Sequence, residues 1–203
     1  FDAFMLLDLT GTANDSPDKI YNPDKYMLYN DCFMGQFDST VRPGDAESYT
    51  ACAEKLAAWE SEPNFGYLFR SAKALCQVLG TKFDLGIRTR NAYLSRDMDG
   101  LKALIGEYQK LLSQLEVFYG AFRTQWMKEN KPHGFDVQDV RLGGLMQRVK
   151  HCTERLNAYV QGETDRIEEL EEPVLDPLCR NEMSATGPIC HNNWSMTVTT
   201  NVI

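Results

Sequence analysis

The residues best suited to binding chemistry lie in one stretch, WMKENKPHGFDVQDVRLGGL, which begins at Trp126. It places an aromatic ring, charged groups and an amide around a loop between two long apolar repeats. Loops held by rigid helices are common positions for binding groups, and Trp and Arg are enriched at interface hot spots. The candidate binding residues are Trp126, Glu129, Asn130, Lys131 and Arg141.

Two interpretations of this stretch stay open. In the simpler one it is an ordinary helical hairpin, in which Asp136 caps the second helix, Trp126 belongs to the core and Arg141 forms a surface ion pair. In the other it lines a carbohydrate site or a subunit interface, because the face of a Trp side chain stacks well on a sugar ring. The sequence does not choose between them.

Patterns typical of catalytic and metal sites are missing from the sequence. The histidines, His133, His151 and His191, stand in no HExxH motif and next to no cysteine at a ligand spacing, so we expect no metal ion. There is no GxGxxG or GxSxG, and the Glu-rich run at 168–172 is typical of a solvated helix end. We therefore expect no catalytic residue and no cofactor.

Charge and composition argue against two classes of partner, nucleic acids and membranes. The net charge is −8 and no basic cluster offsets it, so binding to a phosphate backbone is not expected. No apolar run approaches the roughly 20 residues that span a bilayer, so we expect no membrane contact. The six cysteines have no CxxC spacing, and we predict that they are reduced core residues, which favours a cytoplasmic location.

The spacing of apolar residues predicts the helices that must hold the candidate loop. A short helix is expected over 22–31, because Asn22 and Pro23 suit an N-cap and a first helical position. Longer helices with apolar stripes are expected over 45–61, 65–93, 101–126 and 140–159. Asp45 is the expected N-cap of the first long helix, and Gly162 is the expected glycine after the last one.

These elements predict a mainly α fold, an antiparallel bundle of about four helices within residues 45–172. The remaining segment, 173–203, is expected to be irregular and to end in a β-strand, because WSMTVTTNVI alternates apolar and polar residues. At the other end, Phe1 lies within an apolar pattern, so we expect the chain to begin inside a longer protein.

Four segments of the chain are distinctive, in order FDAFMLLDL, NPDKYMLYNDCFMGQFD, ENKPHGFDVQDVRLGGL and GETDRIEELEEPVLD. They resemble the region that follows the catalytic barrel in family 20 glycoside hydrolases, in the branch of exo-β-N-acetylglucosaminidases. The resemblance runs from Phe1 to about Asp176, and it implies a family in which a (β/α)₈ barrel removes terminal β-linked N-acetylhexosamines by substrate-assisted hydrolysis. The adjacent Asp-Glu pair of that barrel does not occur here, so no catalytic residue is carried over.

What the resemblance implies is an accessory role. Residues 1–44 would connect the bundle to a barrel that this chain lacks, and the bundle would pack on that barrel and join two subunits as a homodimer. The candidate residues around Trp126 would then approach an active site and contact carbohydrate. The alternative is a free-standing helical bundle that recognises other proteins.

Overall fold

The computed structural model describes residues 23–38 and 41–174 of the chain. Within these ranges the chain forms helices and no strand, so the predicted mainly α fold is confirmed. The C-terminal strand predicted near the end of 173–203 lies outside the described residues, as does the first half of the predicted connector.

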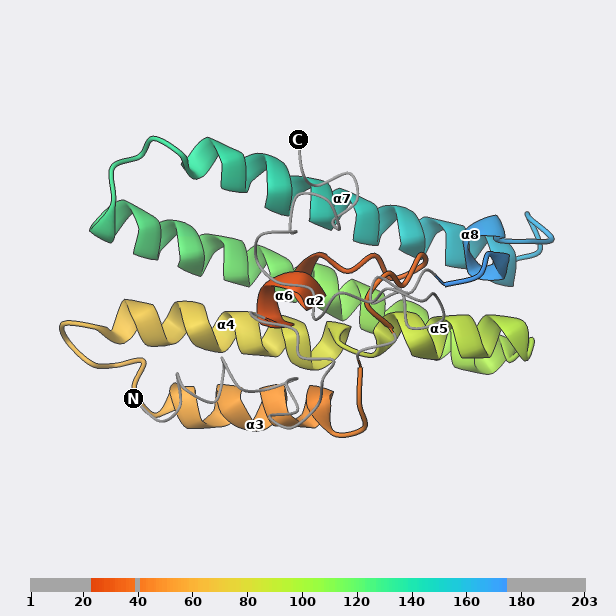
Figure 1. The fold of residues 1–203 in the computed structure, drawn as a ribbon, viewed down its shortest axis with the longest axis horizontal. Coiled ribbons are helices and arrows are strands. Elements are labelled where there is room, and N and C mark those ends of the chain that lie inside the picture. The colour runs from red at the N-terminus through yellow and green to blue at the C-terminus, as the bar shows by residue number, and fades with distance from the viewer. Residues whose placement is uncertain (1–22, 39–40, 175–203) are drawn as a thin grey trace, which may run out of the picture.

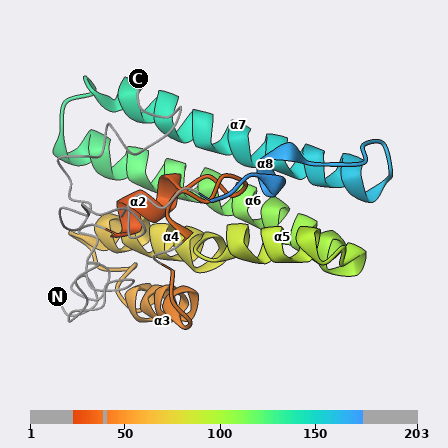
Figure 2. The same cartoon turned by 45° about the vertical axis from the view of Figure 1, so that its right-hand side comes forward.

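The helices form an elongated bundle in which successive long helices run in opposite directions (Figures 1 and 2). In chain order they are α2 (Pro23–Tyr29), α3 (Asp45–Ala57), α4 (Gly66–Lys82), α5 (Leu85–Leu94), α6 (Met98–Glu129), α7 (Phe135–Val160) and α8 (Glu168–Glu171). Helix α5 continues in the direction of α4, and α6 and α7 then form a long antiparallel hairpin. As a result the α3–α4 and α6–α7 loops lie at one end of the bundle and the α5–α6 turn at the other (Figure 1).

Helix α6 follows the clearest sequence pattern. Asp97 caps its N-terminus by accepting a hydrogen bond from the Gly100 N–H, and the predicted break at Arg96 and Asp97 is confirmed. The side chains it buries recur at three and four residues: Leu101, Leu104, Ile105, Tyr108, Leu111, Leu115 and Phe118. Because this stripe faces α4 and α7, packing of one helix face orients the whole bundle.

The single helix predicted over 65–93 is wrong in one respect, since the structure divides it into α4 and α5. The backbone leaves the helical region at Asp84, whose φ and ψ are −111° and 0°. The new direction brings Gly86 against the carbonyl oxygen of Cys32, which would lie 2.8 Å from an added Cβ. The break therefore makes room for a segment far away in sequence, which no local pattern reveals.

Helix α3 also differs at both ends from the prediction. Its N-cap is Gly44, with φ at +92°, and Asp45 instead accepts a hydrogen bond from the backbone N–H of Arg42. The helix ends at Ala57 rather than near Ser61, because the chain tightens there to reverse into α4. Gly66 then approaches the Glu60 carbonyl oxygen, which also accepts a hydrogen bond from Arg70.

Residues 23–38 belong to the same hydrophobic core as the long helices. Tyr26, Met27, Phe33 and Phe37 are almost fully buried. Helix α2 lies across the middle of the bundle in both views of the ribbon (Figures 1 and 2). Whether residues 1–44 form a separate connector stays a prediction, but the core is continuous across position 44 in the part of the chain described.

Two cations donate hydrogen bonds to the carbonyl oxygens at the ends of short helices. Lys82, which is 3% exposed, donates to the carbonyl oxygens of Met27 and Asn30 at the C-terminal end of α2. Arg90 donates to the carbonyl oxygens of Glu169, Leu170 and Glu172 around α8 and to that of Phe33. Carbonyls at helix ends lack partners within the helix and attract positive charge, so each cation satisfies groups that burial would otherwise leave unpaired.

A third cation, Arg148 of α7, binds the carboxylate of Asp31 through two hydrogen bonds, of 2.6 Å and 3.1 Å. The same carboxylate accepts the backbone N–H groups of Phe33 and Met34. Burial alone raises the pKa of Asp31, but the hydrogen bonds and charge of Arg148 and the two N–H groups outweigh it, so the pKa lies below its usual value. The segment after α2 is therefore fixed to α7 by an ion pair.

Helices α5 and α7 end in the same backbone motif with different residues. After α7, the N–H groups of Gly162 and Glu163 bond back to Tyr159 and Ala158, and Gly162 has a φ of +76°, as the sequence predicts. After α5, Arg96 and Asp97 bond back to Tyr93 and Ala92 in the same way. Arg96 has a φ of +56°, a conformation that glycine adopts far more easily.

The described cysteines, Cys32, Cys52, Cys76 and Cys152, are buried and free, as predicted for core thiols. Burial raises the pKa of each of Cys32, Cys76 and Cys152, which keeps these thiols protonated and unreactive. Cys179 and Cys190 lie outside the described residues. None of the helices seen here is both long enough and apolar enough to cross a membrane.

We expect Asp31→Asn to lower the free energy of unfolding at pH 7 by about 3 kcal/mol, because it removes the closer of the two carboxylates that pair with the partly buried Arg148. Folding depresses the pKa of Asp31. The contribution of its carboxylate to the free energy of unfolding is therefore complete above the unfolded pKa of about 4, and it is lost as pH falls through the lower pKa of the folded state. Urea denaturation at pH 7 and pH 3 measures both effects. Asp99→Asn, at an exposed ion pair, is the control and changes stability by less than about 0.5 kcal/mol. Equal losses in the two variants at pH 7 would contradict the role of Asp31.

We expect Arg96→Gly to raise the free energy of unfolding by about 1 kcal/mol, because glycine adopts the left-handed conformation of this position without strain. The neighbouring Ser95→Gly is the matched control and lowers stability, since Ser95 has right-handed helical angles and a hydroxyl bonded to Asn91. Thermal denaturation separates the two signs. A loss of stability in Arg96→Gly would show that the arginine side chain itself stabilises the fold.

Candidate functional site

Trp126 lies in an aromatic cluster where α6 meets α7. Its ring is 6.1 Å from that of Phe122 and 5.7 Å from that of Phe135, measured between ring centroids. Tyr119 extends the cluster, with its ring centroid 5.9 Å from that of Phe135. The indole N–H donates to the carbonyl oxygen of Lys131 at 2.9 Å, which fixes the loop to the helix. Trp126 is thus half-buried in this aromatic cluster at the end of the bundle.

Glu129 links the end of α6 to the start of α4. Its carboxylate accepts a hydrogen bond of 3.1 Å from the hydroxyl of Tyr67, and the ammonium of Lys128 lies over the ring of the same tyrosine. Contact with Glu129 raises the pKa of Tyr67, after a larger contribution from desolvation. The start of α4 and the end of α6, which adjoin the two loops at this end of the bundle, are therefore joined by polar contacts at the surface.

Asn130 and Lys131 form the turn itself. Asn130 is the C-cap of α6 in an extended conformation, and its N–H bonds to the carbonyl oxygen of Trp126. The side chains of both residues are exposed. Across the loop, Asp136 accepts a hydrogen bond from the N–H of Gly134, which is the N-cap of α7. The N-cap expected at Asp136 is therefore two residues earlier, at Gly134, whose φ is +93°.

Arg141 lies apart from the other candidates, on the side of α7 that faces α2. It is close enough to Lys25 and Tyr29 to affect the pKa of both. The pKa of Lys25 is lowered, first by desolvation and then by the charge of Arg141. Burial raises the pKa of Tyr29 to about 12, although the charge of Arg141 acts in the opposite direction. The surface ion pair expected for Arg141 has no counterpart in the described residues, where its Nε is buried without a hydrogen-bond partner. The structure brings together Trp126, Glu129, Asn130 and Lys131, and places Arg141 elsewhere.

Exposed apolar side chains that no sequence pattern reveals lie on and beside the two loops at this end of the bundle. Trp59 and Phe65 in the α3–α4 loop are 52% and 58% exposed, and Met127 and Val137 beside the α6–α7 loop are 45% and 43% exposed. We call these four residues the apolar end. The sequence pattern does not reveal them, because Phe65 stands on the apolar stripe expected for the helix over 65–93 and Trp59 follows Leu56 at helical spacing.

This end of the bundle carries side chains that are suited to contact with another molecule. Tyr119 donates a hydrogen bond of 2.8 Å to Asp139, which raises the pKa of its hydroxyl. The described residues contain no group of His, Cys, Asp and Glu side chains that could hold a metal ion. The corner instead combines exposed aromatic and aliphatic faces with an ammonium, a carboxylate and an amide. Such a mixture is common at protein interfaces and at sugar sites.

Comparison with known proteins adds a family. A search of curated proteins finds no match. A protein family described as the Glycoside Hydrolase 20C C-terminal domain matches residues 2–187, nearly the whole chain, including all of the described helices. The expected resemblance to the C-terminal domain of family 20 enzymes is therefore confirmed, and the chain belongs to the family of glycoside hydrolase 20C C-terminal domains.

Proposed function

We propose that this domain packs beside the catalytic barrel of a family 20 β-N-acetylhexosaminidase and joins two such subunits. The proposed enzyme removes terminal β-linked GlcNAc or GalNAc, and the barrel supplies the chemistry. The corner formed by Trp126, Glu129, Asn130 and Lys131 would approach an active site of the dimer and contact the sugar. We keep the cytoplasm as the proposed location.

The observation that carries this proposal is the apolar end. Four large apolar side chains at one end of the bundle are each more than 40% exposed. Exposed apolar groups gathered in one region, with polar groups around them, mark contact surfaces in proteins that otherwise keep such groups inside. The Trp126 corner lies in the same region, since Met127 of the apolar end stands between Trp126 and Glu129 in sequence.

Charge favours an apolar contact between two copies. Each chain carries a net charge of −8, so two identical surfaces repel unless they meet through groups without charge. The apolar end offers such groups, whereas the exposed side chains elsewhere on α6 and α7 are mostly charged or polar, apart from Met98, Val117 and Val140. A symmetric dimer would use the same patch on both subunits. Membership of a family of C-terminal domains gives no support to the alternative of a free-standing interaction protein.

We expect the double variant Met127→Asp, Val137→Asp to convert the full-length enzyme that carries this domain from a dimer to a monomer. It places two carboxylates on the apolar end, and burying them in an interface would cost free energy. Because both native side chains are exposed, the fold of the domain is kept. The variant also raises KM for an aryl β-N-acetylglucosaminide, because the corner no longer reaches the active site. Sedimentation velocity and steady-state kinetics measure the two effects.

Val117→Asp is the matched control, because Val117 is 61% exposed on α6 but lies away from the apolar end. It should leave both the sedimentation coefficient and KM unchanged. A double variant that remains dimeric with an unchanged KM would overturn the proposed role of this surface.

A further inference from the structure

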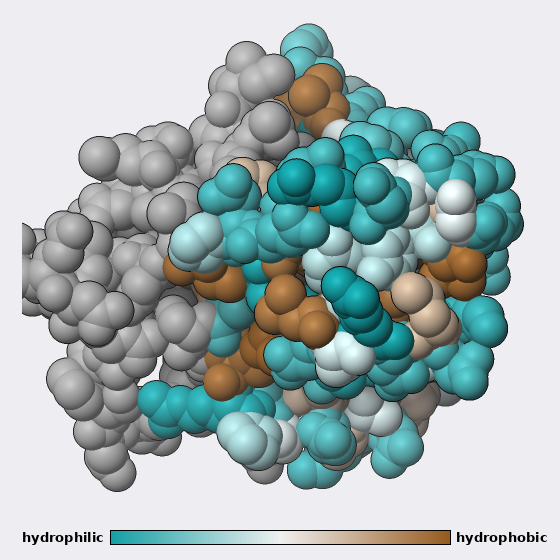
Figure 3. Space-filling view, turned by 90° about the vertical axis from the view of Figure 1, so that its right-hand side faces the viewer, coloured by the Kyte–Doolittle hydropathy of each residue, from teal (hydrophilic) through white to brown (hydrophobic). Residues whose placement is uncertain are grey.

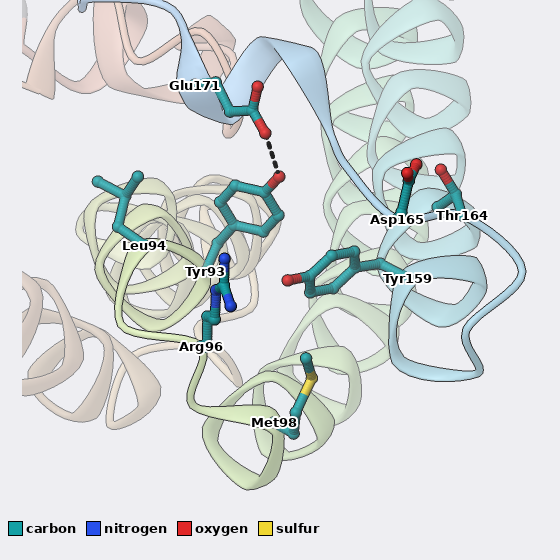
Figure 4. Close-up of a pocket in the computed structure, with 8 residues that line it drawn as sticks. All are labelled: Tyr93, Leu94, Arg96, Met98, Tyr159, Thr164, Asp165 and Glu171. Carbon is teal, nitrogen blue, oxygen red and sulfur yellow. Dashed lines mark hydrogen bonds between the residues drawn. The ribbon is translucent and has the colours of Figure 1, made fainter.

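A cavity of about 500 Å³ lies at the end of the bundle opposite the apolar end. It opens between the α5–α6 turn and the loop that follows α7, and it is lined by Tyr93, Arg96, Tyr159 and Asp165, with Leu94 and Met98 at its apolar parts (Figure 4). We call it the Tyr159 cavity. Its volume lies within the range of small-molecule sites.

One tyrosine of the cavity is held rigidly and the other is available. The hydroxyl of Tyr93 donates to Glu171 at 2.7 Å and accepts the N–H of Ile167 at 2.9 Å, so both its hydrogen-bonding roles are used. The ring of Tyr159 packs against it, with 4.9 Å between the centroids. Figure 4 shows the Tyr159 hydroxyl directed toward the gap between the walls, where it has no hydrogen-bond partner among the described residues.

Arg96 is the unusual member of this cavity. It occupies the glycine position at the end of α5, with a φ of +56°, so a strained backbone presents its side chain to the cavity. No hydrogen bond or ion pair within the described chain uses its guanidinium or the carboxylate of Asp165. In Figure 4, Arg96 lies on the wall formed by Tyr93, and Asp165 lies beyond Tyr159 on the other.

These groups select a class of ligand. A guanidinium donates only, a carboxylate accepts only, and a tyrosine hydroxyl does both, so the unused groups match a molecule rich in hydroxyls, each of which donates and accepts. The charges of Arg96 and Asp165 cancel, and Glu171 is already paired with Arg166 at 2.7 Å. A ligand with a net charge therefore gains little here, whereas a neutral one can use every group.

We propose that the Tyr159 cavity binds a neutral sugar unit, one N-acetylhexosamine residue of a glycan, at a site separate from the Trp126 corner. The sugar ring would lie on the face of Tyr159, its hydroxyls would bond to Arg96, Asp165 and the Tyr159 hydroxyl, and its acetyl methyl would contact Leu94 or Met98. The choice of an N-acetylated sugar among neutral polyols rests on the proposed function.

The surroundings of the cavity fit this role. Leu94 is 61% exposed and Met98 is 37% exposed, which leaves an apolar edge for an acetyl group. The other described residues at this end of the molecule are mostly hydrophilic, with separate apolar patches (Figure 3). A broad protein interface would instead have a continuous apolar centre. A site of this kind would hold a second part of the glycan, or a neighbouring chain of it, away from the barrel.

The test is a titration of the ¹⁵N-labelled 203-residue chain with N-acetylglucosamine and, separately, with leucine as a zwitterion of similar size. We expect amide shifts from the sugar to be confined to residues 93–98 and 159–171, with a dissociation constant on the order of 1 mM. Arg96→Gly and Asp165→Asn each weaken binding at least about tenfold, a loss of one charged hydrogen-bond partner. Because Arg96→Gly relieves backbone strain, its lost binding cannot be attributed to unfolding.

Lys55→Ala and Glu116→Gln, which remove one charge of each sign from exposed positions on α3 and α6 away from both sites, are the controls and bind the sugar as the unchanged chain does. Sugar-induced shifts that are absent from the cavity, or that survive in Arg96→Gly, would overturn the proposal, and so would tighter binding of leucine there. Dimerisation plays no part in this titration. Failure of sugar binding would therefore leave the proposal for the apolar end intact, and failure of the dimer test would leave this site intact.

Discussion

The bundle depends on hydrogen bonds from one buried and two partly buried cations to oxygen atoms of the segment that crosses its middle. Lys82, Arg90 and Arg148 project from three different helices toward residues 27–33, and each donates hydrogen bonds to carbonyl or carboxylate oxygens there. Burying a carbonyl or an ammonium group without a hydrogen-bond partner costs free energy. When the ammonium donates to the carbonyl, both groups have a partner. These contacts allow an irregular segment to run through the middle of a helical bundle, where it would otherwise leave polar groups without partners.

This arrangement gives the two ends of the bundle different surfaces. Since residues 23–38 fill the centre, the long α6–α7 hairpin extends beyond them at one end, where it carries the Trp126 corner and, together with the α3–α4 loop, the apolar end. At the other end, Arg90 holds α8 against α5, and α8 supplies Glu171 to the wall of the Tyr159 cavity. One surface is suited to a protein partner and the other to a small polar ligand, and a single packed core sets the distance between them.

The sequence predicts what is local and misses what is distant. The stripe of α6 and the glycine after α7 are correct because three- and four-residue spacing and a left-handed end are properties of a few neighbouring residues. The break at Asp84 is missed because its cause is the carbonyl of Cys32, more than 50 positions earlier. Arg141 is grouped with Trp126 by proximity in sequence, but the turn between their helices aims it at α2 instead. Likewise Arg96 looks ordinary until its backbone angle is known.

The central claim is that residues 23–38 and the long helices unfold as one unit, because the one buried and two partly buried cations join them. Native-state hydrogen exchange tests it most directly, by comparing the backbone N–H of Phe33 and Phe37, bonded to Asp31 and Asn30, with those of Leu111 and Leu115 in the centre of α6. The account predicts that all four exchange only through global unfolding, with the same opening free energy. Opening of Phe33 and Phe37 at a free energy more than about 2 kcal/mol lower would contradict it, since the segment would then detach from an intact bundle.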